Sequence, residues 1–298
     1  MITRRRFLSI VAGVAVLPAV GVGSTSTVSQ WRGIALGADA HIILDHPDAD
    51  RLIKAAVSEI HRLERIFSLY QSNSQISRLN RDGILQNPAF DMIELLSICS
   101  RLNARTSGAF DPTVQSLWSL YAEEFSAGRQ PSTERISQAM AVTGWQHVNY
   151  SVQEVSFDRT GVMMTLNGIA QGFIADKVTE LFRQNGVKDV LVNTGEIAAL
   201  GVAPDGAAWQ IKLKSESDRI PLSGAAIATS SPSGTTFDQD RAVGHILDPR
   251  TGYSSGIWSS VSVVSHSSAD ADGLSTAFCL MSKPEVIAAK GDCDVYLR

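Results

Sequence analysis

The residues of this chain best suited to chemistry lie near its C-terminus. Asp272 is followed at helical spacing by two hydroxyl side chains, Ser275 and Thr276. Residues three and four positions apart share one side of a helix, so these three oxygens are expected to converge. Oxygen ligands of this kind suit a hard cation such as Mg²⁺. The alternative is that Asp272 or Ser268 only caps a helix beginning near Gly273, which is the commoner role of such residues.

A second candidate segment contains glycines and precedes a predicted helix. Residues 165–172 have the sequence Thr-Leu-Asn-Gly-Ile-Ala-Gln-Gly, and a helix is expected over residues 173–184. Free backbone N–H groups at the start of a helix can bind an anion such as a phosphate. Because glycine loops before helices are common, this segment alone is weak evidence for an anion site.

Helices and hairpin-like strands are mixed around these two segments. Asp111 followed by Pro112 predicts a capped helix through Tyr121, and residues 92–104 have the apolar spacing of an amphipathic helix. Residues 148–164 resemble a hairpin. The other expected elements are a helix over 48–67 and strands over 38–44, 190–192, 209–214 and 225–230. This mixture predicts an α+β fold and not a doubly wound parallel sheet.

The composition limits the class of protein. The chain has 298 residues, enough for one or two domains with a large core. Its formal net charge of −4 gives no general electrostatic basis for binding nucleic acid. The three cysteines, Cys99, Cys279 and Cys293, are odd in number and widely spaced, which argues against a disulfide framework and against a zinc site.

The N-terminus has the pattern of an export signal. Residues 4–8 (Arg-Arg-Arg-Phe-Leu) precede an uncharged apolar run over residues 10–22. The paired arginines resemble a twin-arginine signal, which predicts a periplasmic protein. Residues 23–27 indicate a flexible tether, so we expect a signal peptide and tether over 1–30 and one domain beyond it, over residues 31–298. The alternative is an uncleaved anchor helix.

Seven motif groups in a fixed order extend over nearly the whole chain after this signal. They are residues 68–70 with 77–80, 107–113 (Ser-Gly-Ala-Phe-Asp-Pro-Thr), 166–172, 193–197, 228–230, 245–252 (His-Ile-Leu-Asp-Pro-Arg-Thr-Gly) and 271–277. Each motif alone is weak evidence, but in this order the chain resembles the ApbE family of FAD:protein FMN transferases. The resemblance implies a T-fold-like domain in which helices pack on a mostly antiparallel sheet.

The resemblance implies a Mg²⁺-dependent split of FAD. FMN is transferred to a Ser or Thr hydroxyl of a partner flavoprotein, and AMP is released. His245 matches the family's catalytic histidine, a natural base near neutral pH; the alternative is a turn histidine bonded to loop carbonyls. The implied Mg²⁺ ligands are Asp272, Thr276 and the carbonyl of Gly168. Ser275 stands where some relatives have an acid, so its contribution is through water or absent.

The resemblance also implies a set of flavin contacts. They are Leu36, Tyr70, Ala109, Phe110, Asp111, Thr165, Gln171 and Ile246. The ring of Tyr70 suits stacking on a planar ligand, and the carboxylate of Asp111 suits a donor on ribose or adenine. The alternative for Tyr70 is core packing at the end of a helix.

Two positions depart from the pattern of many relatives. Gln171 replaces a lysine that could face phosphate, and Thr165 replaces an acid. Together with the twin-arginine signal, these changes are similar to the accessory flavinyl transferases of nitrous oxide respiration. That narrower resemblance implies a membrane-linked acceptor flavoprotein that supplies electrons to nitrous oxide reductase.

Two other functions remain open from the sequence. The first is a Mg²⁺-dependent FAD pyrophosphatase, in which water replaces the acceptor hydroxyl. The second is a non-catalytic periplasmic flavin-binding protein, which the neutral Gln171 favours. The presence of His245 together with Asp272 and Thr276 argues against a mere binder, because binding alone requires no base beside a metal.

Overall fold

The structure is a computed structural model that describes residues 14–16, 28–213, 219–238, 240 and 242–298. Most of the expected export signal, and the whole 23–27 tether, lie outside the described residues. Within the predicted apolar run, Val14–Val16 forms a short strand, β1, which pairs antiparallel with β9 (Trp209–Leu213). β9 also pairs with β10 (Arg219–Leu222) to make a three-stranded sheet.

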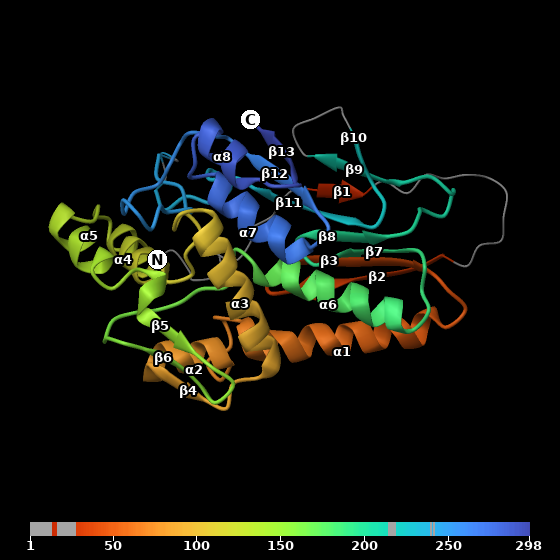
Figure 1. The fold of residues 1–298 in the computed structure, drawn as a ribbon, viewed down its shortest axis with the longest axis horizontal. Helices are drawn as coiled ribbons and strands as arrows, with labels where there is room; N and C mark the ends of the chain where they lie inside the picture. The colour runs from red at the N-terminus through yellow and green to blue at the C-terminus, as the bar shows by residue number, and fades with distance from the viewer. Residues whose placement is uncertain (1–13, 17–27, 214–218, 239, 241) are drawn as a thin grey trace.

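A seven-stranded antiparallel sheet forms the centre of the described molecule (Figure 1). Its strands, in spatial order, are β13 (Asp294–Leu297), β12 (Val261–Ser265), β11 (Ala225–Ser230), β8 (Ile197–Leu200), β7 (Val190–Asn193), β3 (Ala38–Asp45) and β2 (Val28–Ala35). Every neighbouring pair is antiparallel, and β3 meets β7 with His41 opposite Asn193. The predicted α+β class with a mostly antiparallel sheet is therefore confirmed.

The alternation of side chains along each strand divides the core into two layers. Ile42 and Val192 point to one face of the sheet, where they join the main core with the helices. Ile43 and Leu191 point to the other face and pack with Trp209 of β9. The helices on the first face are α1 (Ala49–Phe67), α3 (Phe90–Arg105), α6 (Ala170–Gln184) and α7 (Ser268–Phe278). This arrangement follows from the two-residue period of a strand.

Smaller helices and strands surround the central sheet and the helices that cover it. α4 (Gln115–Ser126) and α5 (Thr133–Met140) pack together at one end of the molecule (Figure 1). The remaining elements are α2 (Gln75–Asp82), β4 (Ile84–Gln86), the 3₁₀ turn η2 (Trp145–His147), β5 (Val148–Tyr150), β6 (Glu154–Phe157) and α8 (Lys283–Ala289). β4, β6 and β5 form a separate three-stranded sheet, which includes the hairpin expected within residues 148–164.

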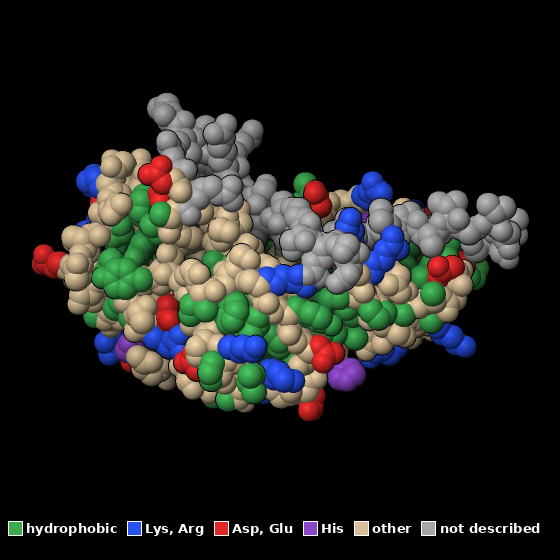
Figure 2. Space-filling view, turned by 90° about the horizontal axis from the view of Figure 1, so that it is seen from above, with side chains coloured by type: hydrophobic (Ala, Val, Ile, Leu, Met, Phe, Trp, Pro, Cys, Tyr) green, Lys and Arg blue, Asp and Glu red, His purple; other side chains and the backbone are tan. Residues whose placement is uncertain are grey.

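The surface of the described molecule mixes both signs of charge. On the face shown in Figure 2, Lys and Arg side chains are interspersed with Asp and Glu side chains and with hydrophobic groups. Among the described helices, none combines the length and apolar character needed to cross a membrane.

The helix expected to begin at Pro112 begins later, and that prediction was wrong. α4 starts at Gln115, with Val114 as its N-cap residue. Residues 112 and 113 form a turn, and Val114 makes an isolated parallel bridge to Met163. Asp111 and Pro112 instead belong to a turn, in which Val114 N donates to the Asp111 carbonyl oxygen at 3.2 Å and Thr113 N donates to Asp111 Oδ1 at 2.8 Å, and the helix begins after this turn.

Close packing of α6 against α7 fixes the position of α7. The Asp176 carboxylate on α6 accepts hydrogen bonds from Ser268 N (2.8 Å), Ala269 N (3.0 Å) and Ser267 Oγ (2.8 Å), so it caps the start of α7. At Gly172, an added Cβ would lie 2.8 Å from Asp272 Cβ and even closer to the Ser268 carbonyl oxygen. The two helix backbones can therefore approach this closely only with glycine at position 172.

Gly172→Ala should destabilise the protein by about 1–3 kcal/mol, because the added methyl group must push α6 and α7 apart. For a chain of this size each kcal/mol lowers Tm by about 2–4 °C, which thermal unfolding followed by circular dichroism would detect. Gly256→Ala is the matched control, since an added Cβ there meets no atom within 4 Å. Equal Tm values for the two variants would contradict this packing argument.

Candidate active site

A cavity of about 270 Å³ lies where the start of α6, the middle of α7, the end of β11 and the loops around residues 110 and 245 meet. Its volume is close to the lower end of the range of small-molecule sites, roughly 300–1,000 Å³. Eleven of the twelve predicted site residues line it, namely Tyr70, Ala109, Phe110, Asp111, Thr165, Gly168, Gln171, His245, Ile246, Asp272 and Thr276. Segments far apart in the sequence are thus brought to one place.

Leu36 is the predicted flavin contact that the structure does not place at this cavity. It lies in the turn between β2 and β3 with φ +47°, and its N–H donates to Glu64 Oε1 at 2.8 Å. Its side chain packs against the main core. In this structure Leu36 therefore has a structural role at the turn.

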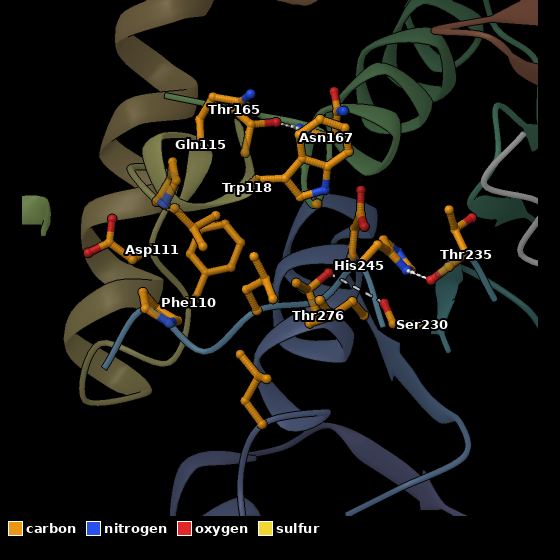
Figure 3. Close-up of a pocket in the computed structure, with 18 of the residues that line it drawn as sticks. Phe110, Asp111, Gln115, Trp118, Thr165, Asn167, Ser230, Thr235, His245 and Thr276 are labelled. Carbon is orange, nitrogen blue, oxygen red and sulfur yellow. Dashed lines mark hydrogen bonds between the residues drawn. The ribbon is translucent and has the colours of Figure 1, made fainter. Parts of the chain in front are cut away.

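The ring of His245 is held by the loop that precedes it. Its Nδ1 lies 2.9 Å from the carbonyl oxygen of Thr235, and its backbone N–H donates to the same oxygen at 3.1 Å (Figure 3). Because a carbonyl oxygen only accepts, Nδ1 must carry the proton and Nε2 must have the free lone pair. Burial lowers the pKa of His245, while the hydrogen bonds from the ring to loop carbonyls oppose this shift. The imidazole is therefore neutral at neutral pH, as a base requires.

Asp272 does not cap α7, so the capping alternative was wrong for this residue. The N-cap is Ser267, whose side chain accepts from Asp270 N, and Ser268 is already inside the helix. Asp272 lies in the helix interior, facing the cavity, and its Oδ2 accepts from Gly172 N at 3.0 Å. That is the one hydrogen bond to this carboxylate within the described chain. Burial raises the pKa of Asp272 to about 7, with a further contribution from the charge of Asp176.

The other two predicted ligands lie beside Asp272. Thr276 is one helical turn further along α7, and an added Cβ at Gly168 would lie 3.0 Å from Thr276 Oγ1. A carboxylate, a hydroxyl and a loop backbone thus meet at one wall of the cavity. No group of three His, Cys, Asp or Glu side chains suited to a metal occurs among the described residues, so any cation here would need hydroxyl or carbonyl oxygens.

Ser275 is turned away from this wall. Its Oγ lies 2.7 Å from Ser230 Oγ and donates to the Asp272 carbonyl oxygen at 3.0 Å. Ser230 also lies 3.4 Å from Thr276 Oγ1, as the dashed line in Figure 3 shows. The hydroxyl of Ser275 therefore bonds Ser230, which lines the cavity beside Thr276.

The glycine loop offers fewer free amides than expected. The amides of Ile169 and Ala170 donate to the Leu166 carbonyl, that of Asn167 donates to Thr165 Oγ1, and that of Gly172 donates to Asp272. Within the described chain, this leaves the amides of Leu166, Gly168 and Gln171 without a hydrogen bond. The loop is positioned from α2, because the Asn80 side chain bonds both Met164 N (2.7 Å) and Met164 O (2.8 Å).

An apolar wall faces these polar groups. Phe110, Trp118 and Ile246 line the cavity, and Figure 3 shows the rings of Phe110 and Trp118. Tyr70 lies at the cavity with 53% of its surface exposed, so the alternative that it is only a core residue was wrong. Aromatic rings around a cavity of this kind suit a flat, aromatic ligand.

The Asp111 carboxylate is occupied by the protein itself. Its Oδ1 accepts from Thr113 N (2.8 Å) and Thr113 Oγ1 (2.6 Å), and its Oδ2 accepts from Trp145 N (2.7 Å). Burial raises the pKa of Asp111, and these hydrogen bonds offset part of that rise. In Figure 3 the carboxylate points away from His245. It therefore stabilises the loop that presents Ala109 and Phe110 to the cavity.

Trp118 and Glu196 are among the residues at the cavity that were not predicted from the sequence. Trp118 lies on α4, where its spacing with Leu117 and Tyr121 is typical of a packing face. Glu196 follows the turn between β7 and β8 and is only 5% exposed. Burial and the charge of Asp272 raise the pKa of Glu196 well above its usual range. The motif at residues 193–197 was the available signal for Glu196, although a turn residue of this type is usually exposed.

Comparisons with known proteins identify the family of this chain. The model of the ApbE family matches residues 34–297. The FAD:protein FMN transferase of Vibrio cholerae is 30% identical over 253 residues, which cover 79% of this chain and 76% of that protein. The FAD:protein FMN transferase of Klebsiella pneumoniae is 25% identical over 289 residues, covering 90% of this chain and 80% of the relative.

Solved structures give the same result. The apo flavinyl transferase ApbE of Pseudomonas stutzeri superposes with a TM-score of 0.79 and 28% identity, covering 92% of this chain and 93% of that one. The ApbE protein of Thermotoga maritima gives a TM-score of 0.82 with 25% identity, covering 91% and 94% of the two chains. The chain therefore belongs to the ApbE family of FAD:protein FMN transferases.

Proposed function

We propose that the chain is an exported, Mg²⁺-dependent transferase that attaches FMN to a Ser or Thr hydroxyl of a partner flavoprotein. The observation that carries this proposal is that His245, with Nδ1 bonded to the Thr235 carbonyl, lines the same cavity as Asp272 and Thr276. FAD is the substrate of the family, and an acceptor flavoprotein is implied by the reaction. To the activity of the family, this proposal adds the Mg²⁺ ion, the roles of the site residues and the periplasmic location.

The proposed reaction is a displacement at phosphorus. The acceptor oxygen forms a bond to the phosphorus of the FMN half, and the bond from that phosphorus to the AMP oxygen breaks. The proton of the acceptor hydroxyl passes to Nε2 of His245, which the Thr235 carbonyl holds in the accepting tautomer. His245 must lie within reach of the acceptor oxygen, and its location on the cavity wall meets that requirement.

The metal fits the donor set of this wall. Asp272, Thr276 and the Gly168 carbonyl would hold Mg²⁺, a hard cation that prefers oxygen ligands. When bound, it would neutralise negative charge on the phosphoryl oxygens. This contribution matters because, among the described residues, no lysine or arginine lines the cavity.

The flavin ring is proposed to lie against the aromatic side of the cavity. Phe110 and Trp118 supply apolar surface, and the exposed Tyr70 is placed to cover the ring from the rim. Ala109, Thr165, Gln171 and Ile246 are the further proposed contacts. Asp111 contributes by shaping its loop, because its carboxylate oxygens are already bonded to Thr113 and Trp145.

An FAD pyrophosphatase remains the second candidate, since it would use the same proposed Mg²⁺ ligands with water as the nucleophile. The oriented base favours either reaction over a non-catalytic flavin carrier.

The proposed export through the twin-arginine pathway to the periplasm is based on the arginines of residues 4–8. The proposed membrane-linked acceptor of nitrous oxide respiration is based on Gln171 and Thr165.

The test is to incubate the purified mature protein with FAD, Mg²⁺ and a flavoprotein fragment that carries an Asp-Gly-x-Thr-Gly-Ala-Thr segment. Mass spectrometry of the fragment should show covalent FMN that disappears when Mg²⁺ is chelated. Release of AMP and free FMN without a modified fragment would favour the pyrophosphatase. Bound, intact FAD with no product would favour a flavin carrier.

The pH dependence of FMN transfer should reveal the pKa of the proposed base, His245. Because burial lowers the pKa of His245, Nε2 stays unprotonated down to a pH below the ordinary histidine value of about 6.5. At saturating Mg²⁺, kcat/KM should therefore be level from pH 7 to 8 and fall only below about pH 6.5. An acidic limb well above that value would contradict this assignment.

A further inference from the structure

His245 belongs to a loop whose two arms are bonded to each other. The backbone N–H and Nδ1 of His245 both lie within hydrogen-bond distance of the Thr235 carbonyl oxygen, at 3.1 and 2.9 Å. Thr236 forms an isolated antiparallel bridge with Gly244, and the backbone N–H of Phe237, one residue further, donates to the opposite arm at 2.9 Å. The position of the imidazole therefore depends on the position of the arm that contains Thr235 and Phe237.

Phe237 packs its ring among three aromatic side chains of α4. The centre of its ring lies 5.4 Å from that of Trp118, 5.5 Å from that of Tyr121 and 6.1 Å from that of Phe125. These separations lie within the range of roughly 4.5–7 Å that is typical of favourable aromatic pairs. Only 8% of Phe237 is exposed, so the ring anchors its arm of the loop to the helix.

The chain that follows His245 is attached to α4 as well. The buried Leu247 belongs to the same apolar cluster as Phe237 and Tyr121. The hydroxyl of Tyr121 donates to the Gly252 carbonyl oxygen at 2.9 Å. Segments on both sides of His245 in the sequence are thus held by one helix.

We infer that α4 is the platform that positions His245 for proton transfer, and that Phe237 is the side chain that attaches the loop carrying His245 to it. The inference rests on the proposed role of His245 as the base. Phe237 itself does not line the cavity, so it can act on the reaction only through residues that do. Because a displacement of about 1 Å from the productive geometry can cost roughly a hundredfold in rate, a loosened loop should slow transfer.

The first test separates the rate of transfer from the binding of FAD. Phe237→Leu keeps an apolar side chain but removes the ring contacts with α4. At saturating FAD and Mg²⁺, kcat for FMN transfer should fall by roughly tenfold or more. The Kd of FAD, measured by quenching of flavin fluorescence without an acceptor, should stay close to the wild-type value, because the residues that line the cavity are unchanged. Phe237→Tyr keeps the ring and should keep most of the wild-type kcat.

The second test needs neither FAD nor a metal. Diethyl pyrocarbonate modifies accessible histidine rings, and the tryptic peptide of residues 242–250 contains His245 as its only histidine. His245 is partly buried in the wild-type protein, so a loosened loop should increase its modification rate several-fold in Phe237→Leu. The exposed His266 is the internal reference, and its rate should be the same in both proteins.

Phe182→Leu is the matched control for lost aromatic packing. Phe182 is fully buried on α6 in the main core and does not line the cavity. Its replacement should lower Tm but leave kcat and the modification of His245 unchanged at a temperature where the protein is folded. If Phe237→Leu does not fold, Tyr121→Phe decides the question, because it removes only the hydroxyl that holds Gly252. It should lower kcat with FAD affinity unchanged.

The outcomes that contradict the inference are distinguishable from one another. Wild-type kcat and wild-type modification of His245 in Phe237→Leu, or wild-type kcat in Tyr121→Phe where that variant decides, would show that α4 does not position the base, and the proposed function would stand. A fall in FAD affinity that matches the fall in transfer would instead assign Phe237 to support of the Trp118 ring in FAD binding. If the wild-type protein transfers no FMN, the proposed function fails, and the modification rates alone decide whether Phe237 holds the imidazole.

Discussion

Asp272→Asn should lower transfer of FMN to an acceptor by roughly a hundredfold or more while leaving the protein folded. Asp272 is the one carboxylate in the proposed ligand set, so its replacement removes the charge that attracts the cation. The amide oxygen of asparagine can still accept from Gly172 N, which preserves the contact between α6 and α7. Activity should be measured against Mg²⁺ concentration, with folding checked by circular dichroism.

The same variant should also change how the metal-free protein responds to pH. The folded-state pKa of about 7 lies above the ordinary value near 3.9. Stability from this raised pKa is fully present below the unfolded value and is lost as pH rises through about 7. With EDTA, Asp272→Asn should therefore have a higher Tm than wild type at pH 8, and this advantage should shrink toward pH 5.

Asp270→Asn is the matched control for both measurements. Asp270 lies two positions earlier on α7, pairs with Arg101 and is not a cavity residue. It should keep Mg²⁺-dependent transfer. Normal transfer with ordinary metal dependence in Asp272→Asn would eliminate Asp272 as a ligand.

His245→Asn should lower transfer by roughly 100- to 10,000-fold, the range that a general base contributes, with FAD affinity unchanged. Asparagine can still donate to the Thr235 carbonyl in place of Nδ1, so the loop should keep its position. It has no group equivalent to Nε2, so the acceptor hydroxyl loses its proton acceptor. Single-turnover transfer and equilibrium FAD binding should be measured on the same preparation.

His266→Asn is the matched control, because His266 is exposed, follows β12 and does not line the cavity. An unchanged transfer rate in His245→Asn would rule out His245 as the base. Loss of FAD binding together with transfer would instead assign His245 to binding.

The sequence predicted those parts of the site that depend on local spacing. Asp272 and Thr276 are four residues apart on one helix, so their placement on one side of α7 follows from helix geometry alone. The α+β class follows in the same way, from apolar periods typical of helices and strands. The motifs in family order then predicted that distant loops would meet, and eleven of the twelve predicted residues do line the cavity.

The remainder depends on contacts between segments that no local pattern contains. Asp111 precedes Pro112 as a helix cap would, yet Trp145 N is the partner that occupies its Oδ2. Trp118 has the spacing of a core residue, and only the position of α4 brings its ring to the cavity. Glu196 is buried in a turn that is bonded to β11 through Thr229 N and to the start of α6 through the Gln171 carbonyl, which a turn motif alone cannot indicate.

The strand order of the central sheet also bears on when this molecule can fold. β2 and β3 are synthesised early, but the inner edge of β3 is completed only by β7, through pairs such as His41 with Asn193. Pairing between residues so far apart in the sequence is slow, because a long loop must close before any contact stabilises it. Until then, the edge of β3 has no partner and is open to aggregation. A twin-arginine signal carries proteins that are already folded. The proposed export route would therefore place this slow step before transport and deliver the sheet complete.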